Sequence, residues 1–228
     1  MNINKLLTNT NYEKGYGKQN KYIVIHYVGA TGGAEDNCRY FLSNYRGASA
    51  HYFVGHKGEV WQCVEDKNIA WHCGAYYYKH PYCRNSNSIG IEMCCRQNVS
   101  NGTWYFEEET IKSTIELTKE LMKKYDIPAS NVIRHYDVTG KTCPEPYVRD
   151  TAAWNTFKAN LTATKPASGY VVRITADNLN VRAGAGVGYR INTVVKKGEA
   201  FTIVDELNGW GKLKSGAGWI NLGYTKRV

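Results

Sequence analysis

Apolar residues occur along the first two thirds of the chain in short runs that are typical of buried strands. KYIVIHYVGA, residues 21 to 30, is rich in β-branched and aromatic residues and ends at a glycine cluster, so it predicts a strand with His26 near its C-terminal end. ASAHYFVGHKGEVWQC, residues 48 to 63, predicts a hairpin that turns near His56 to Gly58, and SIGIEMC, residues 88 to 94, predicts a further strand. These segments together predict a sheet.

One long segment instead follows helical spacing. Between Glu107 and Tyr125 the apolar residues recur mostly at helical intervals, with acidic residues at the start and lysines at the end. A proline follows, and NVIRHYDV then predicts a strand that delivers His135 to the next loop. A short helix around residues 152 to 161 closes this part of the chain. The pattern predicts an α/β domain, with a mixed central sheet flanked by helices, over residues 1–161.

The pattern changes after residue 161. TATKPASG, residues 162–169, is small, polar and proline-bearing, as interdomain linkers are. Residues 170–228 show short alternating strands between Gly, Asn and Lys turns, with no segment long enough for an amphipathic helix. We therefore predict a second domain that is a small all-β barrel.

Composition and charge narrow the classes of protein. A length of 228 residues suffices for two domains. There is no apolar run of 18 residues and no N-terminal run of signal-peptide type, so we expect synthesis in the cytoplasm and no membrane insertion. An extracellular substrate would then require release by a holin or by lysis. Seven cysteines, an odd number without paired Cys-x-x-Cys spacing, favour reduced and mostly buried thiols.

The net charge of +9 is uneven, because residues 166–228 hold 9 Lys and Arg against 4 Asp and Glu, or +5 of the total. A basic protein can meet nucleic acid, an anionic membrane or an anionic polymer such as a bacterial wall, and charge alone does not choose among these or exclude simple solubility. The tyrosines and lysines form no recognisable nucleic-acid module, so we expect no nucleic-acid partner.

NVIRHYDVTGKTCPEP, residues 131 to 146, is the segment with the most chemistry, since it places His135, Lys141 and Cys143 within nine positions. A neutral imidazole and a thiolate are ligands that zinc prefers, and His26 is a candidate for the third ligand, which would leave a fourth position for water. Taken alone, His26 on an apolar strand is more often a core histidine than a ligand, and Cys143 is more often a packed thiol.

Four sequence motifs occur in this order over roughly residues 20 to 160: IVIHY, AWHCG, SIGIEMC and RHYDVTGKTCPEP. The set resembles the zinc-type N-acetylmuramoyl-L-alanine amidases, whose fold is shared with peptidoglycan recognition proteins and phage lysozyme-like amidases. The resemblance implies one Zn²⁺ ion held by His26, His135 and Cys143. Cys143 takes a place that some relatives fill with aspartate.

The resemblance also implies a mechanism. Glu92 would act as general base toward zinc-bound water, and Lys141 would stabilise the oxyanion that forms at the amide between muramic acid and L-alanine. His72 resembles the substrate-facing histidine of a WHAG-like loop, although Cys73 replaces the usual alanine. His51 and Trp71 are further candidates for substrate binding.

NLNVRAGAGVGYR and WGKLKSGAGWINLGY resemble the bacterial SH3-like (SH3b) domain over residues 170–228. Such domains usually bind cell-wall peptide, and Tyr189, Trp210 and Tyr224 are candidate contacts, whereas Trp219 equally fits the core. The glycines of GAGVG lack the spacing of a phosphate-binding loop.

The resulting hypothesis is a peptidoglycan hydrolase with a wall-binding domain, of the phage endolysin type, acting on a wall that we expect to be Gram-positive. The alternatives are a host autolysin and a peptidoglycan recognition protein that binds muropeptide without cleaving it. A complete set of metal ligands together with Glu92 and Lys141 argues against the recognition protein, because a pure binder needs no metal site.

Overall fold

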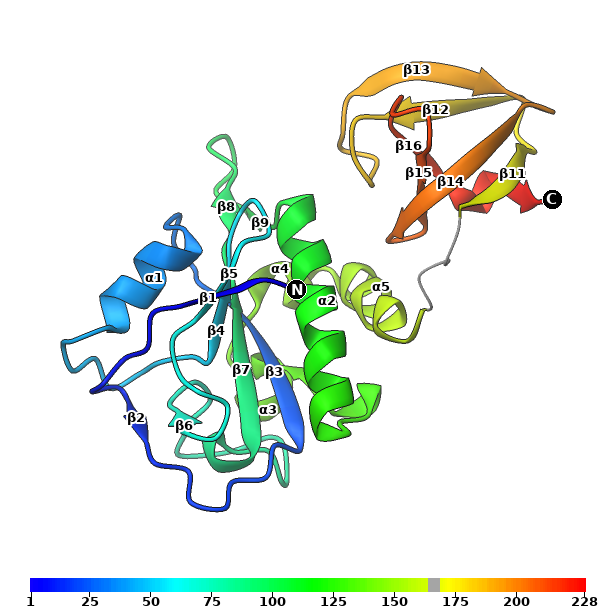
Figure 1. The fold of residues 1–228 in the computed structure, drawn as a ribbon. Helices are drawn as coiled ribbons and strands as arrows, with labels where there is room; N and C mark the ends of the chain where they lie inside the picture. Colours follow the sequence, from blue (N-terminus) through cyan, green and yellow to red (C-terminus); the bar gives the residue numbers. More distant parts are fainter. Residues whose placement is uncertain (164–168) are drawn as a thin grey trace. The chain divides into compact units, whose positions relative to one another are not determined.

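The structure is a computed structural model that describes residues 1–163 and 169–228. The chain forms two compact units, Met1–Leu161 and Thr162–Val228 (Figure 1). Most of the predicted linker, residues 164–168, lies outside the described residues. The two units are described separately.

The first unit is built on a mixed six-stranded sheet (Figure 1). In spatial order its strands are β1 (Ile3–Lys5), β5 (Val60–Gln62), β4 (Tyr52–Val54), β7 (Ser88–Met93), β3 (Tyr22–Tyr27) and β10 (Val132–Arg134). Strands β4 and β5 form the predicted antiparallel hairpin, and the other neighbouring pairs of this sheet are parallel. Two small sheets accompany it: β2 (Tyr12–Glu13) with β6 (Ile69–Ala70), and β8 (Arg96–Gln97) with β9 (Trp104–Tyr105).

The central strands are apolar because both faces of the sheet are covered. Ile23, Ile25, Ile89 and Ile91 on β3 and β7 are fully buried, as expected for parallel strands packed on both sides. The helices of this unit are α1 (Ala34–Phe41), α2 (Glu108–Tyr125), α3 (His135–Thr139), α4 (Glu145–Arg149) and α5 (Thr151–Thr162). Helix α2 contacts β4 and β7, whereas α3 contacts β3 and β10. The predictions of α2 and α5 are confirmed, but α1 and α4 were not predicted.

One prediction about this unit is wrong. The segment NVIRHYDV is not a continuous strand, since β10 ends at Arg134 and α3 begins at His135. The Asp137 carboxylate accepts a hydrogen bond of 2.9 Å from the Arg134 main-chain N–H and so satisfies a free donor at the start of the helix. Gly140, at φ +86°, ends the helix in a left-handed conformation. His135 therefore lies on a short helix and not at the end of a strand.

The second unit is all-β, as predicted. Its seven strands follow the order β13 (Ile191–Lys196), β12 (Asn178–Arg182), β16 (Trp219–Asn221), β15 (Trp210–Leu213), β14 (Ala200–Leu207), β11 (Tyr170–Ile174) and β17 (Thr225–Arg227). A single 3₁₀ turn, Leu222–Tyr224, precedes β17. The core is aliphatic and includes Val172, Val181, Ile203, Leu213 and Ile220. Across the described part of the whole chain, we find no helix with the length and apolar character needed to span a bilayer.

Candidate active site

Neighbouring parallel strands bring the candidate residues together near the carboxyl ends of β3, β7 and β10. Strands β3 and β7 pair in a register that sets His26 beside Glu92, both near the C-terminal ends of their strands. Strand β10, on the other side of β3, runs parallel to it and leads directly into His135. The carboxyl ends of parallel strands are where sites in α/β sheets gather.

His26, His135 and Cys143 converge. One ligand atom from each of these buried residues lies within 4.8 Å of the others, and Cys143 Sγ is 3.7 Å from His26 Nδ1. The Tyr136 main-chain N–H donates to the Cys143 carbonyl at 2.8 Å, which ties the cysteine loop to the start of α3. Among the described residues, the buried Nδ1 of His135 has no hydrogen-bond partner. Two imidazoles and a thiol around one point, with one nitrogen unpaired, fit a metal ion of the zinc type.

Burial keeps both imidazoles neutral, as metal ligands must be. It lowers the pKa of His26 well below the usual range, assisted by the nearby His135. The pKa of His135 falls to about 4 through burial and the Lys141 charge. Burial, with Glu92 nearby, raises the pKa of the Cys143 thiol to about 12. Binding of a metal by Cys143 therefore has to release a proton.

The Glu92 side chain is directed toward the three candidate ligands. Its Oε1 lies 3.9 Å from His26 Nδ1, and its buried Oε2 lacks a hydrogen-bond partner within the described residues. Burial raises the pKa of Glu92 to about 8, against an opposing effect of Lys141. A carboxylate with a raised pKa and an unpaired oxygen is suited to exchanging protons near neutral pH.

An open cleft of about 840 Å³ borders the site at His135. The cleft is within the size range of small-molecule sites, roughly 300–1,000 Å³. Lys141, His135 and Thr139 line it at the end formed by α3 and the following loop. The remaining lining residues come from the N-terminal half of the chain: Glu13, Tyr45, Gly47, Ala48, Trp71, His72, Gly74, Ala75 and Asn85.

His72 borders the cleft, but its ring nitrogens have partners inside the protein. Its Nδ1 lies 3.0 Å from His26 Nε2, and its Nε2 lies 3.1 Å from Ser88 Oγ. Ser88 Oγ also donates to the Arg84 carbonyl at 2.6 Å. Gly90 permits this arrangement, because a Cβ there would come within 2.5 Å of the His72 ring.

The donors and acceptors in this chain of hydrogen bonds can be assigned from its last member, the Arg84 carbonyl. A carbonyl only accepts, so the Ser88 hydroxyl donates to Arg84 and accepts from His72 Nε2–H. His72 Nδ1 then accepts from His26 Nε2–H, and the unprotonated His26 Nδ1 directs its lone pair toward Cys143 Sγ. The geometry therefore makes His72 the group that orients the His26 ring, a role of the kind that outer-shell residues have for metal ligands.

His51 is fully buried and does not border the cleft. The Gly90 main-chain N–H donates to His51 Nδ1 at 3.0 Å, so in the neutral ring the proton is on Nε2. That nitrogen lies 3.1 Å from the Asn68 carbonyl and 3.0 Å from Lys18 Nζ. This geometry does not support the predicted contact of His51 with substrate.

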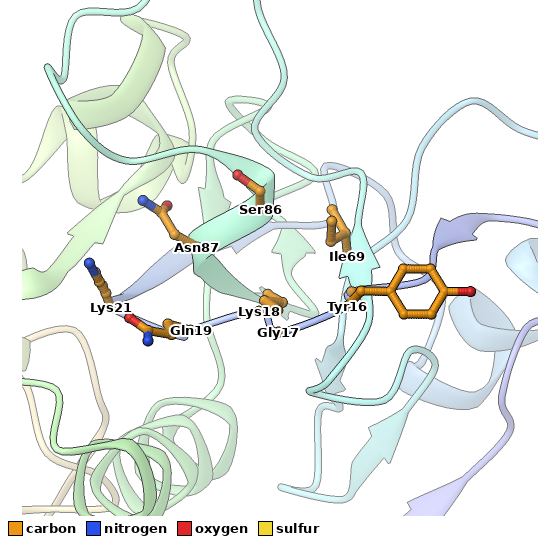
Figure 2. A pocket seen from close by; sticks show the side chains of 9 residues that line it. Tyr16, Gly17, Lys18, Gln19, Lys21, Ile69, Ser86 and Asn87 are labelled. Atoms are coloured by element: carbon orange, nitrogen blue, oxygen red, sulfur yellow. The ribbon is translucent and has the colours of Figure 1, made fainter.

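Lys18 lies in a separate hollow of about 340 Å³, with Tyr16 and Lys21 on either side of it (Figure 2). Its Nζ donates to the carbonyls of Asn68, at 2.8 Å, and Asp66, at 3.3 Å. A protonated Lys18 amine has only N–H donors, which would face the Nε2–H donor of His51. A neutral Lys18 amine has a lone pair and can accept a hydrogen bond from that N–H. Burial indeed lowers the pKa of Lys18 to about 8, although Asp66 opposes the shift.

The predicted wall contacts of the second unit differ in exposure. Tyr189 and Tyr224 are 36% and 54% exposed, but Trp210 is only 8% exposed and Trp219 only 3%. Both tryptophans are buried, so the geometry does not support Trp210 as a wall contact.

Comparison with known proteins defines the class. Residues 16–146 match the family described as N-acetylmuramoyl-L-alanine amidase, and residues 177–226 match the bacterial SH3 domain. The first match spans more than half of the chain. The chain therefore belongs to the N-acetylmuramoyl-L-alanine amidase family, and the predicted resemblances of both domains are confirmed.

Individual relatives agree with this assignment. A probable N-acetylmuramoyl-L-alanine amidase of Bacillus licheniformis is 36% identical over 149 residues, which are 60% of this chain and 40% of that protein. A mutant endolysin from Bacillus subtilis superposes with a TM-score of 0.57 at 28% identity, over 71% of this chain and 99% of that one. The catalytic domain of XlyA gives a TM-score of 0.58 at 27% identity, with the same coverage. The chain spans about 40% of the length of three curated relatives that it matches.

Sequence analysis missed several residues of the cleft, among them Glu13 and Asn85. Glu13 and Asn85 line it, and Asn85 Oδ1 accepts hydrogen bonds from the main-chain N–H groups of His72, at 3.2 Å, and Cys73, at 2.8 Å. Neither residue lies in a recognisable motif, since Glu13 is in a two-residue strand and Asn85 begins a three-residue 3₁₀ helix. No signal in the sequence pointed to them.

Proposed function

We propose that this protein is a zinc-dependent N-acetylmuramoyl-L-alanine amidase that cleaves the amide between N-acetylmuramic acid and L-alanine in peptidoglycan. The observation that carries the proposal is the meeting of His26, His135 and Cys143 within 4.8 Å, beside the unpaired carboxylate oxygen of Glu92. The names of the relatives support the reaction.

We propose His26, His135 and Cys143 as the ligands and zinc as the metal. Two imidazoles and one thiolate suit Zn²⁺ better than the harder Mg²⁺ or Ca²⁺ ions, and three protein ligands leave a coordination position open. When bound, the ion would supply a Lewis acid for the amide carbonyl and lower the pKa of water.

Glu92 is the proposed general base. Its carboxylate takes a proton from the attacking water and later gives that proton to the leaving amine of L-alanine. Burial raises the pKa of Glu92 to about 8, which supports the assignment of a carboxyl group that can hold a proton. Lys141 is the proposed electrostatic partner of the oxyanion, because it lines the same cleft beside His135.

The second unit is proposed to bind the wall of a Gram-positive bacterium. Exposed Tyr189 and Tyr224 are the candidate contacts, whereas the buried Trp210 is now proposed as a core residue. Attachment through the second unit would raise the concentration of the catalytic unit at an insoluble polymer. We propose the cell wall as the place of action and an endolysin as the type of protein.

Metal analysis of a ligand variant tests this proposal. We expect one zinc ion per chain in the purified protein, and we expect Cys143→Ala to lose both the metal and the release of N-terminal alanine from muropeptides. Cys95→Ala is the matched control, since Cys95 is also buried but bonds through Sγ to the Ala30 carbonyl at 3.6 Å. A Cys143→Ala protein that keeps its zinc and its activity would overturn the ligand assignment.

A further inference from the structure

The cleft carries one negatively charged group. Of its lining residues, Glu13 and Lys141 have fully charged side chains, and Lys141 lies with His135 at the proposed catalytic end. Glu13 lies on β2, which pairs with β6 in the register Glu13 to Ile69, and Trp71 follows β6 directly. Within the described residues, neither Glu13 nor Lys141 takes part in an ion pair.

Glu13 is held in place by a neutral donor. Its Oε1 accepts a hydrogen bond of 3.0 Å from Trp71 Nε1. Trp71 is fixed in turn, because its main-chain N–H donates to Ser49 Oγ and its carbonyl accepts from the Ser49 N–H, both at 3.0 Å. Its ring meets Tyr45 edge to face at a centroid distance of 5.9 Å. The carboxylate is therefore positioned before any ligand arrives, and it can accept further hydrogen bonds.

A carboxylate that is held in place beside two aromatic rings is suited to binding an ammonium group. A primary ammonium on an alkyl chain can donate to the carboxylate in a charge-assisted hydrogen bond while its methylenes and charge lie against aromatic faces. A group that carries its own carboxylate beside the amine would be repelled by Glu13.

We propose that Glu13, Trp71 and Tyr45 form a subsite for a free side-chain ammonium group of the peptidoglycan stem peptide. The substrate class is therefore a stem peptide whose diamino acid ends in an unsubstituted amine, as L-lysine does, in preference to one that ends in an amino acid centre, as meso-diaminopimelate does. This inference rests on the proposed function, since it assumes that a stem peptide occupies the cleft.

The test uses the full chain and three peptides. The tripeptide L-Ala-γ-D-Glu-L-Lys, its Nε-acetyl form and its meso-diaminopimelate counterpart are measured for binding by calorimetry, and the corresponding muramoyl peptides for cleavage. Glu13→Gln keeps an acceptor for Trp71 Nε1 and removes the charge. Glu116→Gln, on the exposed side of α2, is the matched control.

We expect the wild-type protein and Glu116→Gln to bind the lysine peptide about 10-fold more tightly than the acetylated peptide, equivalent to about 1.4 kcal/mol. Glu13→Gln should lose this preference while its affinity for the acetylated peptide stays unchanged. Equal binding of the lysine and acetyl-lysine peptides by the wild-type protein, or an equal loss for both in Glu13→Gln, would overturn the subsite. Selective binding without any cleavage would leave the subsite standing and refute the proposed amidase function.

Discussion

His72 borders the cleft, and both of its ring nitrogens also have partners inside the protein. Its ring lies between His26 and Ser88, with hydrogen-bond distances of 3.0 and 3.1 Å, and so holds His26 in the tautomer with an unprotonated Nδ1. Loss of such outer partners typically weakens metal affinity by about 10- to 100-fold. We expect this loss of zinc affinity in His72→Ala and a smaller one in Ser88→Ala.

Competition with a fluorescent chelator measures that affinity directly, without the reaction. The KM for a muropeptide separates the two possible roles, because a residue that only contacts substrate raises KM and leaves zinc affinity unchanged. His72→Ala with wild-type zinc affinity and a raised KM would restore the substrate role that the sequence predicted.

Lys18 gives a second prediction for a single residue, concerning pH. Its folded pKa is about 8 and its ordinary value is 10.5, so between these pH values the unfolded chain binds more protons than the folded one. The free energy of unfolding therefore rises with pH across this window, by at most about 1.4 kcal/mol per pH unit from this group. Lys18→Met removes the titration and should flatten the rise.

Urea denaturation of both proteins at several pH values between 8 and 10.5 measures this difference. Tyrosines and cysteines also titrate there, but they are common to both proteins and cancel in the comparison. Parallel curves for the two proteins would show that Lys18 is not a neutral amine in the fold.

The residues of the proposed metal site could be named from the sequence because the ordered motifs resemble the amidase family, whereas His26 and Cys143 taken alone fit a core histidine and a packed thiol. The groups that surround and orient these residues could not be predicted. Ser88 and the Arg84 carbonyl reach His72 through the tertiary structure, and Glu13 reaches the cleft through a two-residue ladder with β6. Nothing in the local sequence separates these groups from ordinary polar residues.

At the scale of elements, Asp66 joins the C-terminal end of α2 to the hairpin of β4 and β5. Its carboxylate accepts hydrogen bonds from Tyr125 at 2.6 Å, Tyr52 at 2.5 Å and Lys124 at 2.9 Å, and the residue is only 6% exposed. Burial alone would raise the pKa of Asp66, but these three donors outweigh it and hold the pKa below the usual range.

We expect Asp66→Asn to lower the free energy of unfolding at pH 7 by about 1–3 kcal/mol, the usual range when a buried hydrogen-bond network is disturbed. Because the folded pKa is depressed, the stabilisation is present above the unfolded value near 4 and is lost as pH falls through the folded pKa. Thermal denaturation from pH 7 to pH 3 checks this, and the gap between the two proteins should narrow on acidification. A constant gap would mean that the charge of Asp66 is not what stabilises the contact.

The local pattern of apolar residues predicts the long helices and strands well and the short ones poorly. The apolar run of β3 and the helical spacing of α2 extend over enough residues to predict the element. At His135 the chain changes from β10 to α3, a five-residue helix that the Asp137 carboxylate caps at its start and Gly140 ends. Periodicity over a few residues cannot detect such a change.

At the scale of the whole molecule, the two compact units make separable predictions. A chain that ends at residue 163 keeps all of the first unit and should cleave a soluble muropeptide at a rate close to that of the full chain. Its action on intact walls should fall, because attachment through the second unit is lost. Pelleting with purified walls and turbidity clearing measure the two effects. Equal clearing by both proteins would argue against a wall-binding role for residues 170–228.

The central claim is that these side chains hold a metal and cleave the amide next to muramic acid. The most direct measurement is digestion of purified Gram-positive walls, with and without a chelator, in which new N-terminal alanine and new reducing sugar ends are both counted. We predict N-terminal alanine that disappears with chelator, returns with added zinc and is nearly absent for Glu92→Gln, whose zinc content should stay unchanged. New reducing ends without N-terminal alanine, or release of alanine that chelator does not affect, would contradict the proposed mechanism.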